Sequence, residues 1–189
     1  MSLEIPEQLN ADRIYLQRLR YEFAEEIFFA YASKPEATKF VSWQIHRSME
    51  DTKRYLNYAV NAWQNGTDYS FGIRLRGTNR LIGSIGCVND EGKVQVGYVF
   101  SPVFWNQGYA TEACRALLTK LKSLANVHRI WTFTDSENHA SRKVLHKCGL
   151  VEEARLTKWF RFVNQGNEPK DCVFYKVPDE FMAMDLVSK

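Results

Sequence analysis

The stretch from Val94 to Leu124 constrains the fold more than any other part of the sequence. Residues 94–100 are β-branched and aromatic, which predicts a buried strand. Residues 101–107 break that pattern, and Pro102 has no amide hydrogen to donate to a neighbouring strand. From Gly108 onward, apolar residues recur with a helical period and form one stripe: Ala110, Ala113, Cys114, Leu117, Leu118, Leu121 and Leu124. The stretch therefore predicts a strand that leads through a tight turn into a long helix.

The turn before this helix is suited to binding phosphate. The first amides of a helix have no partners within it, and with the helix dipole they attract anions. Gly108 lacks a Cβ where a ligand would approach the backbone, and Ala110 keeps the next position small. The turn has no lysine and no G-x-x-x-x-G-K-[ST] pattern, so a nucleotide P-loop is not indicated. On this stretch alone, an ordinary connection that binds nothing remains an equal alternative.

The turn resembles the acetyl-coenzyme A (acetyl-CoA) signature of the GNAT superfamily of N-acetyltransferases, Q/R-x-x-G-x-G/A. The register here is Trp105-Asn106-Gln107-Gly108-Tyr109-Ala110. The sequence is still more similar to the ribosomal-protein N-terminal acetyltransferase (RimJ/RimL)-like branch, where G-Y-x-x-S-P, an aromatic residue and G-Y-A-T-E-A are typical. The matching residues are Gly97, Tyr98, Ser101, Pro102, Gly108, Tyr109, Ala110, Thr111, Glu112 and Ala113. Two positions differ, because Trp105 replaces Gln or Arg and Asn106 stands where glycine is common.

A second motif supports this resemblance. The segment 138–150 is similar to the family's N-x-A-S followed by K-x-G-F, with Leu150 in place of Phe. The matching residues are Asn138, Ala140, Ser141, Lys147 and Gly149. Together the two motifs place about half of the chain within the resemblance.

The remaining patterns predict an α+β order within one domain, residues 1–189. The expected strands are residues 13–19, 69–75, 80–88, 94–100, 129–134, 150–161 and 170–177. The expected helices are residues 21–31, 48–63, the signature helix and a short helix ending near 147. Helix 21–31 should bury Phe23, Ile27, Phe28 and Tyr31, and Pro35 marks a break after it. Ser48 and Asp51 have the spacing of a capping box at the start of the second helix.

The resemblance implies a GNAT-like fold: a mixed, mostly antiparallel central sheet, splayed between two neighbouring strands and flanked by helices on both faces. The strand with Gly97 would diverge from strand 129–134, and acetyl-CoA would lie in the gap as co-substrate. The residues that the resemblance assigns to cofactor binding are Val99, Phe100, Trp105, Asn106, Gln107, Gly108, Tyr109, Ala110, Thr111, Asn138 and Ser141. Arg142, Lys143 and Lys147 are further phosphate candidates, although a solvated helix face explains them equally well.

The family's usual proton-handling residues are absent. Gln95 stands near the position where many members have a glutamate base, and Leu145 stands where many have a tyrosine acid. Ser141 is the remaining candidate for the acid, with a structural role as the alternative, and a backbone N–H near Phe100 would stabilise the oxyanion. At pH 7 an α-amine with a pKa of about 7.8 is roughly one tenth neutral. A lysine side chain with a pKa of about 10.4 is less than roughly 0.1% neutral at the same pH. A site without a strong base therefore favours an α-amine.

The acceptor site is expected to involve residues from the N-terminal half. Trp43, His46 and Tyr69 are candidates for substrate binding, together with Gln95. A base from this half would be His46, Glu50 or Asp68.

Composition excludes several classes of protein. The net charge of +3 and the absence of a Lys/Arg run do not indicate nucleic acid as a partner. No apolar run is long enough to span a membrane and no leader pattern opens the chain, which predicts a cytoplasmic protein. The four cysteines are widely spaced and are expected to be reduced thiols. No metal site is expected, and a homodimer is possible.

The sequence thus predicts an acetyl-CoA-dependent N-acetyltransferase. The predicted acceptor is a primary amine, foremost a protein or peptide N-terminal α-amine that attacks the thioester directly. The alternatives are a small amine such as an antibiotic, amino acid or polyamine, and a CoA-binding regulatory module with little turnover.

Overall fold

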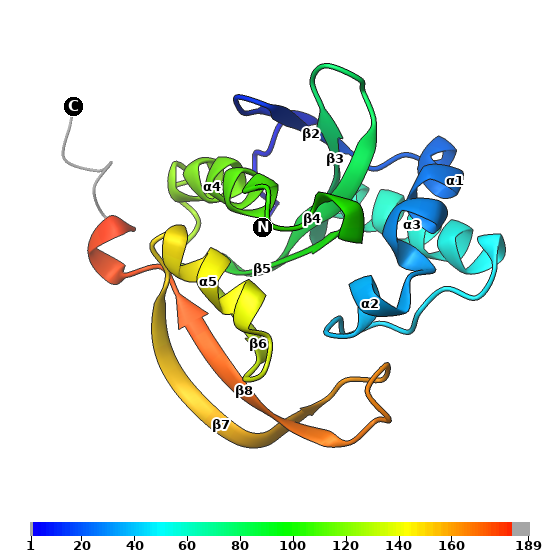
Figure 1. Ribbon diagram of the computed structural model, residues 1–189. Helices are drawn as coiled ribbons and strands as arrows, with labels where there is room; N and C mark the ends of the chain where they lie inside the picture. Colours follow the sequence, from blue (N-terminus) through cyan, green and yellow to red (C-terminus); the bar gives the residue numbers. More distant parts are fainter. Residues whose placement is uncertain (1, 183–189) are drawn as a thin grey trace.

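One sheet of eight strands runs through the protein, and helices lie on both of its faces (Figure 1). The computed structural model describes residues 2–182, so both ends of the predicted domain 1–189 lie outside the described residues. The strand order is β1-β2-β3-β4-β5-β6-β8-β7. Neighbouring strands are antiparallel except for β5 and β6, which are parallel. The strands are β1 (Gln8–Asn10), β2 (Ile14–Arg18), β3 (Asp68–Leu75), β4 (Leu81–Asp90), β5 (Lys93–Phe100), β6 (Arg129–Asp135), β7 (Val151–Arg161) and β8 (Pro169–Lys176). The predicted mixed, mostly antiparallel sheet is confirmed.

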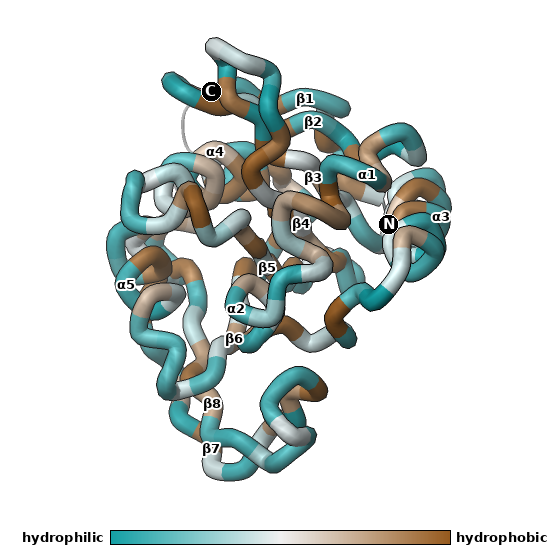
Figure 2. Tube along the Cα trace, turned by 45° about the vertical axis from the view of Figure 1, so that its right-hand side comes forward, coloured by the Kyte–Doolittle hydropathy of each residue, from teal (hydrophilic) through white to brown (hydrophobic). Residues whose placement is uncertain are grey.

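Each face of the sheet has its own hydrophobic core. The first lies under α4 (Tyr109–Lys122) and α5 (His139–Lys147), and includes Leu117 and Leu145. The second lies under α1 (Ala24–Ile27) and α3 (Met49–Gln64), and includes Ile27 and Leu56. We call these sides the α4 face and the α3 face. Between the two faces, the most hydrophobic segments run along the central strands β4 and β5 (Figure 2). Hydrophilic residues cover the outer sides of α3 and α5.

The N-terminal helices differ in detail from the prediction. The expected helix 21–31 is divided into a 3-10 turn (Tyr21–Phe23), α1 and a π-helical turn (Phe28–Ala32), and Phe28 is only half-buried. Pro35 begins a short helix, α2 (Pro35–Thr38), because the first helical residue needs no amide hydrogen. The Ser48–Asp51 capping box at the start of α3 is confirmed.

The sheet divides between β5 and β6. Backbone pairing joins Lys93 to Arg129 and continues only to Gln95 and Trp131, although both strands extend further. Immediately beyond, the hydroxyl of Thr132 donates to the carbonyl of Val96 at 2.7 Å and so occupies the first position without a backbone partner. The two strands then diverge, as the family resemblance implies. We call this opening the fork.

Candidate functional site

The turn between β5 and α4 has the backbone of an anion site. Gly108 precedes α4 with a φ of 84°, and no side chain of the described residues caps the helix. Asn106 also has a left-handed φ, 59°, a conformation that asparagine tolerates better than most residues with a Cβ. This explains why asparagine can stand where glycine is common. The uncapped first turn of α4 therefore presents its amides to the space beside the turn.

Side chains of the turn stabilise it from within. The indole of Trp105 donates to the carbonyl of Phe100 at 3.1 Å, and the amide of Gln107 donates to the carbonyl of Val103 at 3.0 Å. Trp105 and Gln107 were predicted to bind the cofactor, and the structure shows their side chains holding the shape of the turn. Tyr109, Ala110 and Thr111 form the first turn of α4.

Arg13, which the sequence did not single out, ties the start of β2 to this turn. Its guanidinium donates to the carbonyl of Gln107 at 3.0 Å and forms an ion pair with Glu112 at 2.8 Å. It also lies 4.5 Å from the centre of the Tyr109 ring. A surface hollow of about 860 Å³ lies beside Gly108, and its basic lining residues are Arg13, Arg115, Lys120 and Lys147. Arg142, another phosphate candidate, instead donates to the hydroxyl of Tyr175 at 3.1 Å.

The fork exposes alternate backbone groups of β5. The carbonyls of Val96 and Phe100 accept from Thr132 and Trp105, so these residues direct their backbone groups away from β4. The alternation of a strand gives Tyr98 the same direction. The amide of Ser101 donates to Ile82 of β4, and the same alternation turns the backbone of Val99 toward β4. Phe100 therefore fits its predicted role, Tyr98 joins it, and the backbone of Val99 does not face the fork.

Two hydroxyls meet across the fork between β5 and α5. The hydroxyl of Tyr98 lies 3.0 Å from Ser141 Oγ, and the side chain of Asn138 accepts from the amide of Ser141 at 3.1 Å. Burial raises the pKa of Tyr98 well above its ordinary value, while the hydrogen bond with Ser141 acts in the opposite direction. Tyr98 therefore stays protonated and can donate to Ser141. Leu145 lies in the core and cannot transfer protons.

A row of residues crosses the sheet at the level where the fork begins. Asp68 lies opposite Val88, Val88 opposite Gln95, and Gln95 opposite Trp131. Directly paired residues point to the same face of a sheet, so all four side chains lie on the α3 face. Strands are about 4.8 Å apart, which places the backbones of Asp68 and Gln95 about 10 Å from each other. The sequence indicates Asp68 and Gln95 as separate candidates, and only the strand register places them in one row.

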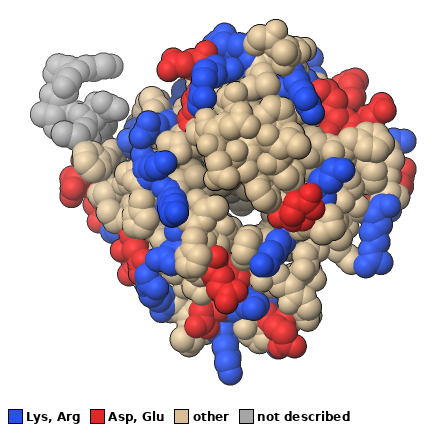
Figure 3. Space-filling model, viewed as in Figure 1, with Lys and Arg blue, Asp and Glu red and all other residues tan. Residues whose placement is uncertain are grey.

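Gly97 opens a space on the α3 face next to this row. A Cβ built at Gly97 would meet no heavy atom within 4 Å. Viewed from the side of Figure 1, the surface is hollowed near its centre, between α5 and α2, with charged side chains at its rim (Figure 3). The α3 face of β5 thus borders unfilled space at Gly97.

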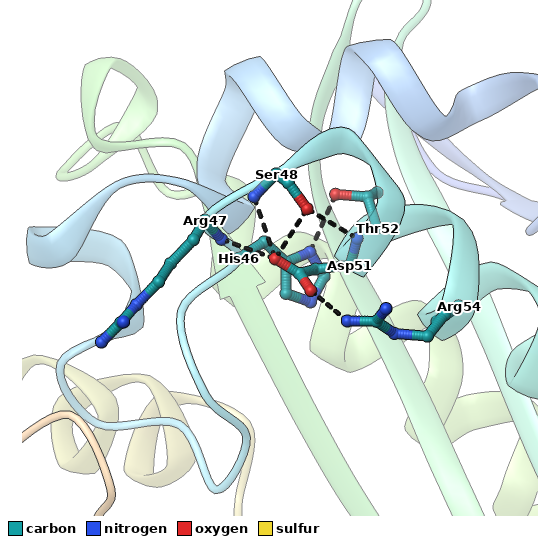
Figure 4. Close-up of polar contacts among 6 residues, drawn as sticks. All are labelled: His46, Arg47, Ser48, Asp51, Thr52 and Arg54. Carbon is teal, nitrogen blue, oxygen red and sulfur yellow. Dashed lines mark hydrogen bonds and ion pairs between the residues drawn. The ribbon is translucent and has the colours of Figure 1, made fainter.

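The loop that leads into α3 brings together three aromatic rings. The ring centre of His46 lies 5.0 Å from that of Trp43 and 6.1 Å from that of Tyr55. His46 Nδ1 lies 2.9 Å from the hydroxyl of Thr52 (Figure 4). Burial lowers the pKa of His46, as does the charge of Arg54, against the opposing charge of Asp51. His46 is therefore neutral at pH 7, and Tyr55 joins the predicted pair of Trp43 and His46.

The capping box on this loop holds its charged residues. Asp51 accepts from the amides of Arg47 and Ser48, both at 2.9 Å, and forms an ion pair with Arg54 (Figure 4). The two backbone hydrogen bonds lower the pKa of Asp51. Its carboxylate is thereby committed to the loop.

The base candidates and Tyr69 occupy different environments. Asp68 Oδ1 accepts from Ser70 at 2.7 Å and Oδ2 accepts from Tyr58 at 3.3 Å. Burial raises the pKa of Asp68 despite these two hydrogen bonds. Glu50 is exposed on α3. Tyr69 is 3% exposed in the core of the α4 face, where its hydroxyl accepts from the amide of Leu3 at 2.6 Å. Tyr69 is thus on the opposite side of the sheet from His46.

The other predicted features concern cysteines, metals and membranes. All four cysteines are free, and Cys87, Cys114 and Cys172 are buried. Among residues 2–182, no group of three or more His, Cys, Asp or Glu is arranged to hold a metal ion. Within the same range, no helix is long and apolar enough to cross a membrane.

Comparison with known proteins identifies the family. Residues 13–151 match a family described as the acetyltransferase (GNAT) domain. The chain belongs to the GNAT acetyltransferases. This GNAT chain is 30% identical over 163 residues to YnaD of Bacillus subtilis, named an uncharacterized N-acetyltransferase, covering 85% of this chain and 91% of YnaD. It is an N-acetyltransferase, as predicted.

Solved structures of GNAT proteins have the same fold. RimL, a ribosomal L7/L12 alpha-N-protein acetyltransferase solved with coenzyme A, superimposes with a TM-score of 0.83 at 16% identity, over 92% of this chain and 99% of RimL. RimJ of Mycobacterium smegmatis, solved with CoA-disulfide, superimposes with a TM-score of 0.84 at 17% identity, over 100% of this chain and 93% of RimJ. At these identities the likeness establishes the fold of this GNAT acetyltransferase.

Proposed function

We propose that this GNAT acetyltransferase transfers acetyl from acetyl-CoA to the N-terminal α-amine of a protein or peptide, by direct attack on the thioester. The observation that carries the proposal is the fork, which joins an uncapped helix start to backbone groups of β5 that have no strand partner beyond Gln95. A diphosphate fits the former and the amides of a pantetheine arm fit the latter. The α3 face then receives the acceptor beside Gly97.

The residues around the turn would hold the cofactor. The backbone from Asn106 to Thr111 would bind the pyrophosphate, because its amides converge at a positive helix end. Tyr98 and Phe100 would bind the pantetheine arm through their backbone groups, and Asn138 would contact it from the other side of the fork. The basic residues of the hollow beside Gly108 suit the remaining phosphate of the nucleotide.

Asp68 would accept the proton of the attacking amine. It lies in one row with Gln95 and Trp131, and water between Asp68 and Gln95 would carry the proton over the intervening distance. Burial raises the pKa of Asp68 toward the working pH, which suits a general base better than an ordinary carboxylate. His46 and Trp43 would shape the acceptor side of the cleft together with Tyr55.

Ser141 would donate its hydroxyl proton to the leaving thiolate and regain a proton from solvent, to which Asp68 releases the proton of the amine. The hydroxyl of Tyr98 lies 3.0 Å from Ser141 Oγ and would orient it, in place of the tyrosine that many family members have at the position of Leu145. When bound, acetyl-CoA supplies the thioester carbonyl, and a free amide of Tyr98 or Phe100 would donate to its oxygen as negative charge develops. No covalent enzyme intermediate is needed.

The chemistry of the site supports an α-amine as acceptor. A carboxylate that acts through water provides weaker deprotonation than a base in direct contact with the amine. At pH 7 removing the proton costs about 3.5 kcal/mol less for an α-amine than for a lysine side chain. The solved structure of RimL, an alpha-N-protein acetyltransferase, has the same fold.

The test uses one peptide that carries both kinds of amine. Wild-type protein is incubated with acetyl-CoA and a peptide with a free N-terminus and one internal lysine, and mass spectrometry locates the acetyl group. We expect acetylation of the α-amine with release of one equivalent of thiol. Acetylation of the lysine or of small amines alone would contradict the proposal. Tight acetyl-CoA binding in a calorimeter without acceptor-dependent thiol release would instead indicate a regulatory module.

A further inference from the structure

Five aromatic side chains form a continuous surface on the strands beyond the fork. Trp131 and Phe133 of β6 stack with Phe174 of β8, with ring centres 5.9 Å and 5.5 Å from that of Phe174. On β7, the ring centre of Phe160 lies 5.2 Å from that of Phe133. The ring of Trp159 packs edge-on against Phe174, with ring centres 5.5 Å apart. We call these five residues the aromatic wall.

An irregularity in β7 aims two consecutive residues at the wall. The pairing of β7 with β8 shifts between Leu156 and Phe160, and Lys158 has a left-handed φ of 49°. In a regular strand, Trp159 and Phe160 would point to opposite faces. The bulge lets both rings contact the same face, and bulges commonly re-aim side chains near functional sites.

The aromatic wall is not part of either hydrophobic core. None of its five members belongs to the cores under α3 or α4. Trp159 is 54% exposed and the other four are half-buried. The opposite face of the same strands is covered, because Tyr175 packs against His146 of α5 with ring centres 5.4 Å apart. Large aromatic surface left outside a core indicates a binding surface.

The wall is continuous with the acetyl-transfer site. Trp131 is paired in register with Gln95, the last position before the strands diverge, so the wall begins beside Gln95 on the α3 face. The indole Nε1 of Trp131 is buried and has no hydrogen-bond partner. Such a donor costs free energy until an acceptor atom satisfies it.

Asn164 joins the β7–β8 loop to the loop that carries Trp43 and His46. From the β7–β8 loop, its side chain donates to the carbonyls of Thr38 and Trp43 at 2.8 Å and 2.9 Å. It also accepts from the amide of Ile45 at 3.0 Å. These three bonds fasten the tip of the hairpin to the loop that carries Trp43, and Figure 1 shows the hairpin reaching toward α2. We call this contact the clasp.

We propose that the aromatic wall binds the first side chain of the acceptor and selects acceptors with an aromatic or large apolar group next to the α-amine. This inference rests on the proposed function, because it places the amine beside Gln95 and Gly97. Burial of one large apolar side chain against the wall corresponds to a preference of about 10- to 100-fold in kcat/KM.

The experiment compares peptides that differ only at the first residue. Tetrapeptides beginning with Phe, Leu, Ser or Asp are assayed by acetyl-CoA-dependent thiol release with wild-type protein. We expect kcat/KM for Phe and Leu to exceed that for Ser and Asp by about 10-fold or more, mainly through a lower KM. Equal values for the four peptides, or a preference for Ser or Asp, would overturn the inference while leaving α-amine transfer intact.

Variants then locate the preference on the wall. Phe174→Ala should reduce the preference for Phe over Ser to about twofold, mainly through a higher KM for the Phe peptide. Phe29→Ala is the matched control, because Phe29 is 59% exposed and lies outside the wall. It should keep the full preference. A preference that survives both Phe174→Ala and Phe133→Ala would overturn the inference.

The alternative occupant of the wall is a second copy of this chain, and the oligomeric state tests for it. Analytical ultracentrifugation should give the same mass for wild type and for Trp159→Ser. A dimer that dissociates in Trp159→Ser, without a change in the peptide preference, would overturn the inference. Failure of every peptide in the panel, with transfer to a small amine retained, would instead contradict the proposed function.

Discussion

The cofactor half and the acceptor half of this site are built in different ways. The proposed cofactor half uses two contiguous segments, 94–111 and 138–150, and would bind largely through backbone groups. The proposed acceptor half combines Trp43 and His46, Asp68, Gln95 and the aromatic wall, which come from six separate parts of the chain because the wall alone spans three strands. A site for one unchanging ligand is specified by local backbone geometry, whereas the acceptor pocket depends on tertiary packing.

The largest effect is expected in the acceptor half, from Asp68→Asn. Loss of the general base should lower kcat/KM at pH 7 by about 100-fold or more, with acetyl-CoA affinity unchanged. Because the pKa of Asp68 is raised, wild-type kcat/KM should fall on the acid side at a pH above the ordinary range of aspartate, and Asp68→Asn should lack this limb. A pH series of initial rates tests both statements, and an unchanged limb would exclude Asp68 as the base.

The pH dependence of the free energy of unfolding should also reflect the raised pKa of Asp68. A raised carboxyl pKa means that folding favours the protonated form, so its stabilising contribution is present below the unfolded pKa and is lost as pH rises through the folded pKa. The free energy of unfolding of Asp68→Asn, measured relative to wild type, should therefore be higher at pH 7 than at pH 3.5. Urea unfolding at the two pH values measures the difference.

In the cofactor half, Gly108→Val should weaken acetyl-CoA binding by about 100-fold, or roughly 2.7 kcal/mol. A branched side chain would enter the phosphate space, and its Cβ would lie 3.3 Å from the guanidinium of Arg13. The matched control is Gly166→Val, since Gly166 also has a left-handed φ, 70°, but lies in the β7–β8 loop. Calorimetric titration should show near wild-type affinity for the control. Equal affinity of Gly108→Val and wild type would remove the phosphate assignment.

The hydroxyl pair should have an intermediate effect that links the two halves. Ser141→Ala should lower kcat by about 10-fold or more while acetyl-CoA affinity changes less than twofold. Tyr98→Phe keeps the ring and removes only the hydroxyl, so it should lower kcat by a smaller factor. Single-turnover rates and calorimetry separate the two quantities. If kcat of Ser141→Ala equals that of wild type, Ser141 has a purely structural role at the start of α5.

The smallest catalytic effect is expected at the clasp. Asn164→Ala removes three hydrogen bonds that join segments more than 100 residues apart in sequence. We expect a loss of about 1–3 kcal/mol in the free energy of unfolding and a few-fold rise in KM for the peptide, with kcat little changed. Thermal unfolding and steady-state kinetics measure these quantities. A changed acetyl-CoA affinity would contradict the separation of the two halves.

The same contrast explains how much of the site could be predicted from sequence. The strand, turn and helix around Gly108 follow from residues next to one another, as does the capping box at Ser48. The row from Asp68 to Trp131 depends on the register of four strands, and a slip of one residue would turn a side chain to the other face. The sequence around Asn164 carries no signal for its partners, because Thr38 and Trp43 are more than 100 residues away.

Two other differences have physical causes. Val99 was predicted to face the cofactor because it lies just before the turn. The alternation of backbone groups along β5 instead turns the backbone of Val99 toward β4. Tyr69 is aromatic and near the other candidates in sequence, but alternation along β3 places it on the α4 face, in the core. Asp68, one residue earlier, lies on the α3 face for the same reason.

A crystal structure of the wild-type protein with CoA tests the central claim most directly. We predict the pyrophosphate against the amides of residues 106–111 and the pantetheine arm within the fork, with its sulfur near Ser141 and the aromatic wall uncovered on the α3 face. CoA bound elsewhere on the surface, with β5 and β6 closed against each other beyond Gln95, would contradict the account.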